Sequence, residues 1–427
     1  MSPTLNSISD VVAYQLCTGC GVCAYIEPDV FSMFDTLEHG RRPIREKSLT
    51  VPESGEALSA CPGVALARPA GLCRQIGLDQ ELLDGWGPVY GVWEGYAADS
   101  EIRYAGSSGG AATALALFCI EQENFSGVLH TAAHHLIPYL NKTVMSTCRS
   151  ELLDRTGSRY APASPAEGLD RVENAESKCV FIGKPCEAAA VQNARSMRPK
   201  LDSKVGVVIA FFCAGVPSLK GNLDLLKANG IPEPSLIGGL RYRGNGWPGM
   251  WTASIRSESG ICDVRTMSYA DSWAYLQRYR QWRCYICPDH SGEFADIAVG
   301  DPWYREVQAG EAGKSLIVAR TLRGLQLVRA AASKGYIVLE SEDKSLLPRS
   351  QPGFLESRAN LWARLIVLRL LGAAVPRYRN FACFRYWLVE LTLREKLQSF
   401  YSTVKRVFSK RLRIPIAVRT WSSGERP

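Results

Sequence analysis

The sequence has no uncharged apolar run of the roughly 18 residues that a bilayer-spanning helix requires. Its nearest approach, residues 361–375, is interrupted by Arg364 and Arg369. The first ten residues lack the basic and apolar segments of a secretory signal. The 14 cysteines among 427 residues fall far below the roughly 8–10% cysteine of a disulfide scaffold. We therefore expect a cytoplasmic protein in which clustered cysteines serve metal or redox chemistry.

Histidine is scarce as well, and the five histidines form no zinc-binding or catalytic pattern. The formal net charge of +8 comes from residues 358–427, which carry 15 Lys and Arg but 3 Asp and Glu. Residues 1–357 are therefore slightly acidic. A nucleic-acid binder should carry its basic patch on a recognisable module with base-stacking aromatics, and the body of this chain shows none. We expect no nucleic-acid partner.

The first cluster of cysteines has a diagnostic spacing. Residues 17–23 read Cys-Thr-Gly-Cys-Gly-Val-Cys, and Cys61-Pro62 follows 38 residues after Cys23. Three thiolates at this spacing, small residues between them and a remote Cys-Pro are typical of a 4Fe-4S cluster. Structural zinc is the alternative, but it usually takes paired C-x2-C knuckles. We predict that one 4Fe-4S cluster binds the first cysteine group: Cys17, Cys20, Cys23 and Cys61.

The surrounding segment, about residues 8–68, resembles single-cluster bacterial ferredoxins. The resemblance rests on the runs CTGCGVCAYIEPDVFSMFD and EALSACPGVAL. Where such ferredoxins can carry a second cysteine triplet, residues 25–28 read Tyr-Ile-Glu-Pro. The resemblance therefore implies a ferredoxin-like domain at residues 1–70 with one cluster.

A second set of cysteines is dispersed along the chain. Cys284 and Cys287 form one C-x2-C pair, which alone is compatible with zinc, a redox dithiol or coincidence. Cys186 and Cys213 each follow an apolar strand, at the carboxyl end where α/β sheets build their sites. These four, the second cysteine group, can ligate a second 4Fe-4S cluster. Ordinary buried thiols are the alternative for Cys186 and Cys213.

A run of small residues opens an alanine-rich helix. Residues 106–110 read Gly-Ser-Ser-Gly-Gly and precede the predicted helix at 109–122. A helix start without bulky side chains exposes free N–H groups and favours an anion such as a flavin phosphate. The run is not the G-x-G-x-x-G of a dinucleotide fold, and a capped helix packed closely on its neighbours explains the same pattern.

Together these features resemble the family of beta subunits of coenzyme F-420 hydrogenases and dehydrogenases over residues 87–375. The matching runs, in order, are 106–110 (GSSGG), 157–160 (GSRY), 183–186 (GKPC), 212–217 (FCAGVP), 246–249 (GWPG), and 284–287 (CYIC) with 295–303 (ADIAVGDPW). The fused ferredoxin-like domain resembles bacterial members associated with surface-polysaccharide gene clusters.

The resemblance implies an iron–sulfur flavoprotein that carries FAD and passes electrons between a reduced carrier and the flavin. It also favours the second cluster. The flavin contacts that it implies are Ser107, Ser108, Gly109, Gly110, Arg159, Tyr160 and Lys184.

The fold class expected is mixed α/β. Strands at 89–97, 127–130, 179–182, 205–212, 252–256, 297–300, 315–319 and 337–339 alternate with helices at 109–122, 186–196, 218–229 and 322–334. We place a flavin and iron–sulfur domain with a mixed sheet at residues 88–350, and a helical, basic C-terminal region at 351–427.

The C-terminal region contains a basic amphipathic pattern. Leu397, Phe400, Val404 and Val407 recur at helical spacing beside several Lys and Arg. Such a helix can lie peripherally on the inner, anionic face of a membrane or dock a partner. A solvated surface helix is the alternative.

The function expected is that of an oxidoreductase with two 4Fe-4S clusters and FAD. Electrons would enter at the ferredoxin-like cluster from ferredoxin, another redox partner or a deazaflavin, and reach the flavin through the second cluster. The flavin would reduce a small-molecule substrate, with surface-polysaccharide biosynthesis as its setting. The alternatives are an electron-transfer subunit without its own substrate and a zinc-stabilised binding module.

Overall fold

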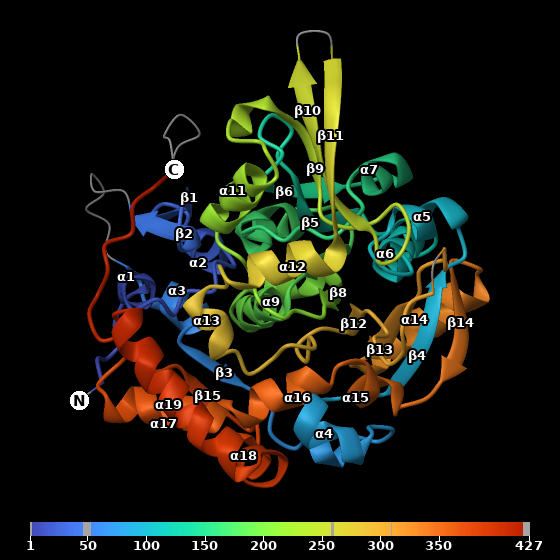
Figure 1. Ribbon diagram of the computed structural model, residues 1–427. Helices are drawn as coiled ribbons and strands as arrows, with labels where there is room; N and C mark the ends of the chain where they lie inside the picture. Colours follow the sequence, from blue (N-terminus) through green and yellow to red (C-terminus); the bar gives the residue numbers. More distant parts are fainter. Residues whose placement is uncertain (1, 46–52, 258–259, 309, 422–427) are drawn as a thin grey trace.

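The computed structural model describes residues 2–45, 53–257, 260–308 and 310–421, and its centre is an eight-stranded mixed sheet (Figure 1). The strand order is β14-β4-β13-β12-β8-β7-β5-β6. The strands are β4 (Gly91–Ala97), β5 (Gly127–Ala133), β6 (Asn141–Ser146), β7 (Cys179–Gly183), β8 (Val205–Phe211), β12 (Ile297–Gly300), β13 (Ser315–Ala319) and β14 (Ile337–Glu342). The sheet confirms the expected mixed α/β class.

The middle of the sheet is parallel and its edges are antiparallel. β5, β7, β8 and β12 run parallel, whereas β6, β13, β4 and β14 extend the sheet with antiparallel pairs. Every residue of β7 is buried, as the near-continuous apolar run Cys-Val-Phe-Ile-Gly predicts for a strand covered on both faces. The carboxyl ends of the parallel strands therefore meet at one edge.

Helices cover both faces of this sheet. On one face, Val180 and Ile182 of β7 pack with α6 (Ala111–Glu121) and α14 (Leu322–Ser333). On the other face, Phe181 packs with α8 (Leu169–Glu173), α9 (Pro185–Met197) and α10 (Pro199–Lys204). Alternate residues of this strand thus pack into two different hydrophobic cores, because successive side chains of a strand point to opposite faces of the sheet.

The N-terminal region packs on the α9 side and shares that core. It contains α1 (Ile8–Ala13), α2 (Val22–Ile26), the antiparallel hairpin of β1 (Phe31–Thr36) and β2 (Gly40–Arg45), α3 (Glu56–Ala60) and β3 (Ala65–Ala67). A parallel pair between β3 and β15 (Arg377–Arg379) joins it to the C-terminal region. The first and last parts of the chain therefore lie side by side (Figure 1).

The C-terminal region is mainly helical, but its last described residues, 415–421, are not in a helix. It holds α16 (Pro352–Ala359), α17 (Leu361–Leu370), α18 (Cys383–Glu390) and α19 (Leu393–Ser409). Beyond α19 the chain runs back along the N-terminal region, where Ile416 donates its N–H to Ala13 O at 2.9 Å and Trp421 to Asp35 O at 2.8 Å.

A smaller antiparallel sheet stands beside the main one. It consists of β9 (Ile237–Arg241), β10 (Met250–Ser257) and β11 (Gly260–Ser268), next to α11 (Leu219–Ala228) and α12 (Tyr269–Gln277). The remaining helices are α4 (Gln80–Trp86), α5 (Ser100–Ala105), α7 (Arg149–Asp154), α13 (Trp282–Tyr285) and α15 (Leu346–Ser350). Within the described ranges, no helix combines the length and apolarity that crossing a bilayer takes.

Candidate functional site

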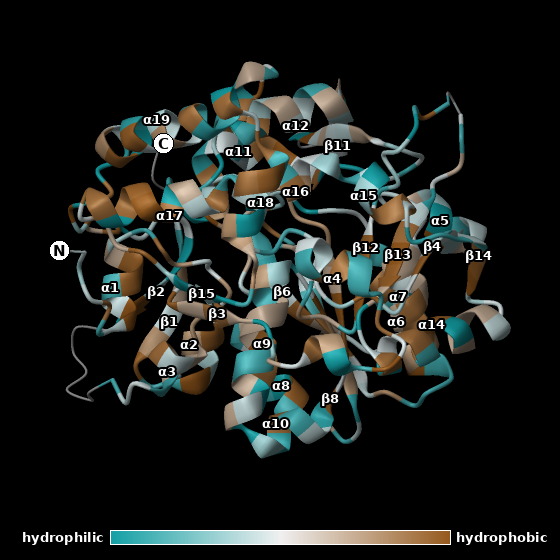
Figure 2. Cartoon of the chain, turned by 90° about the horizontal axis from the view of Figure 1, so that it is seen from below, coloured by the Kyte–Doolittle hydropathy of each residue, from teal (hydrophilic) through white to brown (hydrophobic). Residues whose placement is uncertain are grey.

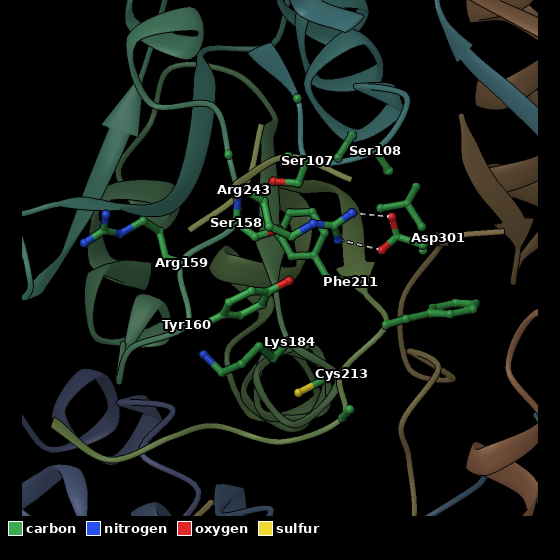
Figure 3. A pocket seen from close by; sticks show the side chains of 18 of the residues that line it. Ser107, Ser108, Ser158, Arg159, Tyr160, Lys184, Phe211, Cys213, Arg243 and Asp301 are labelled. Carbon is green, nitrogen blue, oxygen red and sulfur yellow. Dashed lines mark hydrogen bonds and ion pairs between the residues drawn. The ribbon is translucent and has the colours of Figure 1, made fainter. Parts of the chain in front are cut away.

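A cavity of about 920 Å³ opens at the carboxyl ends of the parallel strands. Gly183 of β7, Phe211 of β8 and Gly300 of β12 all line it, at the edge where open α/β sheets bind ligands. Six of the seven predicted flavin contacts line this cavity, and Gly109 does not. The six are Ser107, Ser108, Gly110, Arg159, Tyr160 and Lys184 (Figure 3).

Helix α6 begins at the cavity without a side-chain cap. Its N-cap, Gly110, has a φ of +72°, and a Cβ there would lie 2.7 Å from Ile102 O. Gly109 donates its N–H to Ser315 Oγ at 2.9 Å, and Ser108 Oγ lies 3.0 Å from the same oxygen. The loop is thus held by the protein, while the first turn of α6 lines the cavity and presents the positive end of the helix dipole.

Two of the predicted contacts are engaged by neighbouring protein groups. Ser107 Oγ accepts the N–H of Ser158 at 2.6 Å, which ties two cavity-lining loops together. The guanidinium of Arg159 donates to oxygens of Asn141, Leu240, Pro138 and Leu140. In Figure 3 it points away from the other labelled side chains. The Arg159 side chain therefore stabilises the cavity wall through bonds to protein oxygens. The sequence had predicted that it contacts the cofactor.

Lys184 and Tyr160 meet the cavity from different elements. Lys184 is the N-cap of α9, and its ammonium forms an ion pair with Glu187, whose side chain is buried. Burial alone would lower the pKa of Lys184, but Glu187 and the thiols of Cys186 and Cys213 raise it above its ordinary value. Tyr160 packs on Trp273 with ring centroids 4.7 Å apart. Lys184 therefore remains a cation between the cavity and the second cysteine group.

An arginine that the sequence analysis missed forms part of the cavity wall. Arg243 makes a bidentate ion pair with Asp301, with distances of 2.8 and 2.7 Å. Trp247 donates its indole N–H to the same carboxylate at 3.0 Å and stacks on Trp303. The Arg243 guanidinium lies 4.4 Å from the ring centroid of Tyr269. Nothing in the sequence around Arg243 signals this role.

The structure brings the four thiols of the first cysteine group together. All four cysteines are buried and none forms a disulfide. Burial, followed by the charges of the other three, raises the pKa of Cys23 well above its ordinary value. Between the cysteines, Thr18 has a buried hydroxyl with no hydrogen-bond partner. A Cβ at Gly63 would lie 3.3 Å from the sulfur of Cys61.

The four thiols of the second cysteine group also meet, although they come from three separate segments. Cys186 lies in the first turn of α9, Cys213 follows β8, and Cys284 and Cys287 lie in and after α13. Burial and then Cys284 raise the pKa of Cys213 to about 12. Burial, Glu187, Cys287 and Cys213 raise that of Cys186. Cys213 also lines the cavity.

The two cysteine groups differ from a single-ion site. Within the described part of the chain, no group of three or more His, Cys, Asp or Glu side chains is placed to hold a metal ion. In a 4Fe-4S cluster each thiolate binds a different iron, so four cluster ligands need not converge on one ion position.

Two buried charged side chains lie between the cysteine groups. Arg283 donates to Pro62 O at 3.0 Å. Burial lowers its pKa, but a nearby tyrosine and the second-group thiols raise it above its ordinary value. Glu187 contributes to the raised pKa of both Cys20 and Cys186. The first group, the second group and the cavity are therefore adjacent in that order.

Comparison with known proteins finds matches for the segments that form the main sheet and this site. The family described as coenzyme F420 hydrogenase/dehydrogenase, beta subunit, is matched in two parts. Residues 92–169 match its N-terminal part, and residues 176–345 match its C-terminal part. Together these segments make up more than half of the chain.

Two relatives come from methanogens. The coenzyme F420 hydrogenase subunit beta of Methanosarcina barkeri is 23% identical over 56% of this chain and 77% of its own length. One of the subunits of the F(420)H(2) dehydrogenase of Methanosarcina mazei is 22% identical over 69% of this chain and 77% of its own length.

A solved structure matches as well. One chain of the F420-reducing [NiFe] hydrogenase complex of Methanosarcina barkeri is 21% identical, and the match covers 65% of this chain and 93% of that chain with a TM-score of 0.49. The two family segments include GSSGG, GSRY, GKPC, the FCAGVP run and CYIC. The chain belongs to the family of coenzyme F420 hydrogenase/dehydrogenase beta subunits.

Proposed function

We propose that this chain is an iron–sulfur flavoprotein oxidoreductase with two 4Fe-4S clusters and one FAD. Electrons from ferredoxin, another one-electron donor or a deazaflavin coenzyme would reach a small-molecule substrate. We place that substrate in surface-polysaccharide biosynthesis, because the fused ferredoxin-like segment resembles bacterial members associated with such gene clusters. The observation that carries the proposal is the assembly of eight cysteines into two groups. The first group is buried, and the second is partly exposed and borders the cavity.

The residues present fit two clusters. Each group supplies four thiols and lies among buried apolar residues, and both N–H donors and small residues approach its sulfurs. The N–H of Gly19 lies 3.3 Å from Cys17 Sγ, and that of Val216 lies 3.4 Å from Cys284 Sγ. Such N–H groups and the unpartnered hydroxyl of Thr18 suit a cofactor with exposed sulfides. We also propose that residues 1–70 form a ferredoxin-like domain around the first group.

The cavity fits a flavin. Its volume of about 920 Å³ lies in the upper part of the roughly 300–1,000 Å³ range of small-molecule and cofactor sites. The uncapped start of α6 provides N–H donors for a phosphate, and Lys184 provides a cation at the side nearest the second group. The stacked rings of Trp303 and Tyr269 provide a flat wall, and Trp247 stacks on Trp303 without lining the cavity itself.

When bound, iron–sulfur clusters pass single electrons and a flavin combines two of them for hydride chemistry. The protein's part is to hold and isolate these groups. The buried thiols of the first group keep water from its cluster, and the Arg243–Asp301 pair fixes the aromatic wall. Arg283 and Glu187 keep the space between the cysteine groups dry and occupied by fixed charges.

The test is an analysis of anaerobically purified full-length protein. We expect about eight irons per chain, matching acid-labile sulfide and one extractable FAD. Cys186→Ala should remove about half of the iron, because it deprives one of two separate groups of a ligand. Cys119→Ala is the matched control, since Cys119 is fully buried in α6 outside both groups and should keep all of the iron.

Colourless protein containing zinc and no iron would refute the proposal. Full iron retention in Cys186→Ala would refute the assignment of the second group alone. Purified protein that contains iron but no flavin would support the two cluster sites and refute the assignment of FAD to the cavity.

A second candidate is an electron-transfer subunit with no organic substrate of its own. The names of both relatives describe subunits, which favours this candidate. The two candidates differ in one measurement, the turnover of candidate substrates by the purified chain with dithionite as donor. Turnover by the chain alone supports the oxidoreductase, whereas turnover that appears only with a catalytic partner supports the relay.

A further inference from the structure

Helix α19 has its apolar face outside. Its side chains at Leu393, Leu397, Tyr401, Val404 and Phe408 are exposed, while Ser399, Thr403 and Val407 are buried. A surface helix of a soluble protein normally turns its apolar stripe toward the core. The sequence pattern of residues 397, 400, 404 and 407 placed Val407 on the exposed stripe, but Val407 belongs to the core.

The reversal follows from how α19 packs. It lies across α17, and the small residues Ser399 and Thr403 allow a close approach, with both hydroxyls satisfied inside the helix by main-chain oxygens. At 3.6 residues per turn, the five exposed apolar residues form one stripe, whose centre lies about 120° around the helix from the centre of the buried residues. Figure 2 shows α19 at the edge of the molecule, with hydrophobic residues along its length.

Helix α18 extends this surface. Phe384, Leu388 and Val389 are exposed, and an aromatic cluster of Trp362, Trp387 and Phe400 joins α17, α18 and α19. We call the combined surface the C-terminal patch: Phe384, Leu388, Val389, Leu393, Leu397, Tyr401, Val404 and Phe408. Contiguous exposed apolar side chains on this scale mark an interaction site.

The charge around the C-terminal patch indicates what kind of surface it binds. Residues 383–413 carry eight Lys and Arg and two Glu. Among the described residues, five exposed cations of this segment have no ion-pair partner: Arg394, Lys405, Lys410, Arg411 and Arg413. Two copies of the patch would repel each other, whereas an anionic surface would attract it. An apolar stripe with flanking cations and an exposed tyrosine is the pattern of a helix at a lipid interface.

We propose that the C-terminal patch binds the surface of an anionic membrane, with α19 lying in the plane of the interface. The proposal is independent of the redox function, because no residue of the patch lines the cavity or belongs to a cysteine group. Val407 of α19 shares a core cluster with the first cysteine group, so binding there would bring that group to the membrane surface.

The test is flotation of the full-length protein with lipid vesicles. The protein should float with vesicles of equal parts phosphatidylglycerol and phosphatidylcholine, less so as salt rises, and not with phosphatidylcholine alone. Leu397→Glu combined with Phe408→Glu should weaken partitioning by at least about tenfold. Leu136→Glu is the matched control, because Leu136 is 67% exposed in the β5–β6 loop and Leu397 is 63% exposed.

The charge contribution has its own pair of variants. Lys405→Gln should weaken partitioning about fivefold. Lys227→Gln, an exposed lysine at the end of α11, should leave it unchanged. Circular dichroism and monomeric elution of each variant check that it is folded.

Three results would overturn the proposal. The first is no flotation with either vesicle. The second is equal loss of flotation in Leu136→Glu and in the patch variant. The third is a dimer in solution that Leu397→Glu dissociates, which would assign the C-terminal patch to a contact between copies of this chain.

Discussion

A buried carboxylate joins three distant parts of the chain, and its removal should destabilise the protein strongly. Glu293, in the loop before β12, pairs with Arg68 after β3 and with Arg358 in α16. The three side chains are at most 4% exposed. Glu293→Gln keeps the volume of the side chain but leaves two buried guanidinium groups without their shared counter-charge.

The size of the effect follows from the pKa of Glu293. Burial raises this pKa, but Arg358 and Arg68 outweigh burial and hold it at about 2. Relative to an ordinary glutamate at 4.5, that difference corresponds to about 3 kcal/mol. It agrees with the roughly 3–5 kcal/mol lost when one partner of a buried ion pair is removed. We expect Glu293→Gln to lower the free energy of unfolding by about 3 kcal/mol.

The pH dependence has a definite sign. Because the folded-state pKa lies below the unfolded one, the stabilisation is complete above about pH 4.5 and is lost only as the pH falls through about 2. Burial and the charge of Glu293 raise the pKa of the neighbouring Asp289 to about 6, so the difference between wild type and Glu293→Gln should be constant only above that range, from about pH 7 to about pH 8.

The assay is guanidinium unfolding of anaerobic protein, followed by tryptophan fluorescence. The control is Glu81→Gln, which removes a carboxylate that is 79% exposed in its pair with Lys344 and should change the midpoint little. If Glu293→Gln unfolds at the same denaturant concentration as Glu81→Gln, the buried pairs do not hold the three segments together and the reasoning is refuted.

Two further variants test the cavity and the space between the cysteine groups. Gly110→Ala should lower FAD retention as well as stability, because its φ is +72° and its Cβ would meet Ile102 O. Gly335→Ala, with a φ of +74° and open space around it, should cost stability alone; equal flavin content in both variants would contradict the role of the α6 start. Arg283→Gln should lower the reduction potential of the second-group cluster in an EPR-monitored titration, because a buried positive charge favours the more negative, reduced state. The exposed Arg278→Gln should leave that potential unchanged, and an unchanged potential in Arg283→Gln would remove the electrostatic role.

Local sequence predicted the parallel core well. It also singled out the first cysteine group, whose thiols the structure brings together, while their role as cluster ligands stays a prediction. The strands at 179–182 and 205–212 are runs of apolar residues that can be covered only from both faces, so their burial follows from composition. Cys17, Cys20 and Cys23 lie within one short loop, so their spacing nearly fixes their arrangement. Sequence was weaker for β6 and β11, whose polar residues hide the strand pattern, and for β9, where two glycines do so.

Contacts between distant segments escaped the local pattern. A short motif places Arg159 at the cavity but does not predict the direction of its guanidinium. That direction is set by hydrogen bonds to four protein oxygens. In the same way, the helical period at the C-terminus revealed an amphipathic helix. Which of its faces is exposed depended on the fit of Ser399 and Thr403 against α17.

The sequence by itself determined the mixed α/β class, the family and which cysteines are candidate ligands, because apolar runs and cysteine spacing are local properties. The tertiary structure decided that Cys186, Cys213 and the Cys284–Cys287 pair meet, that Arg243 and Asp301 pair in the cavity wall, and that the apolar stripe of α19 is exposed. Those outcomes depend on which strands become neighbours and which helix faces fit together. Long-range packing sets both, and no short stretch of sequence encodes it.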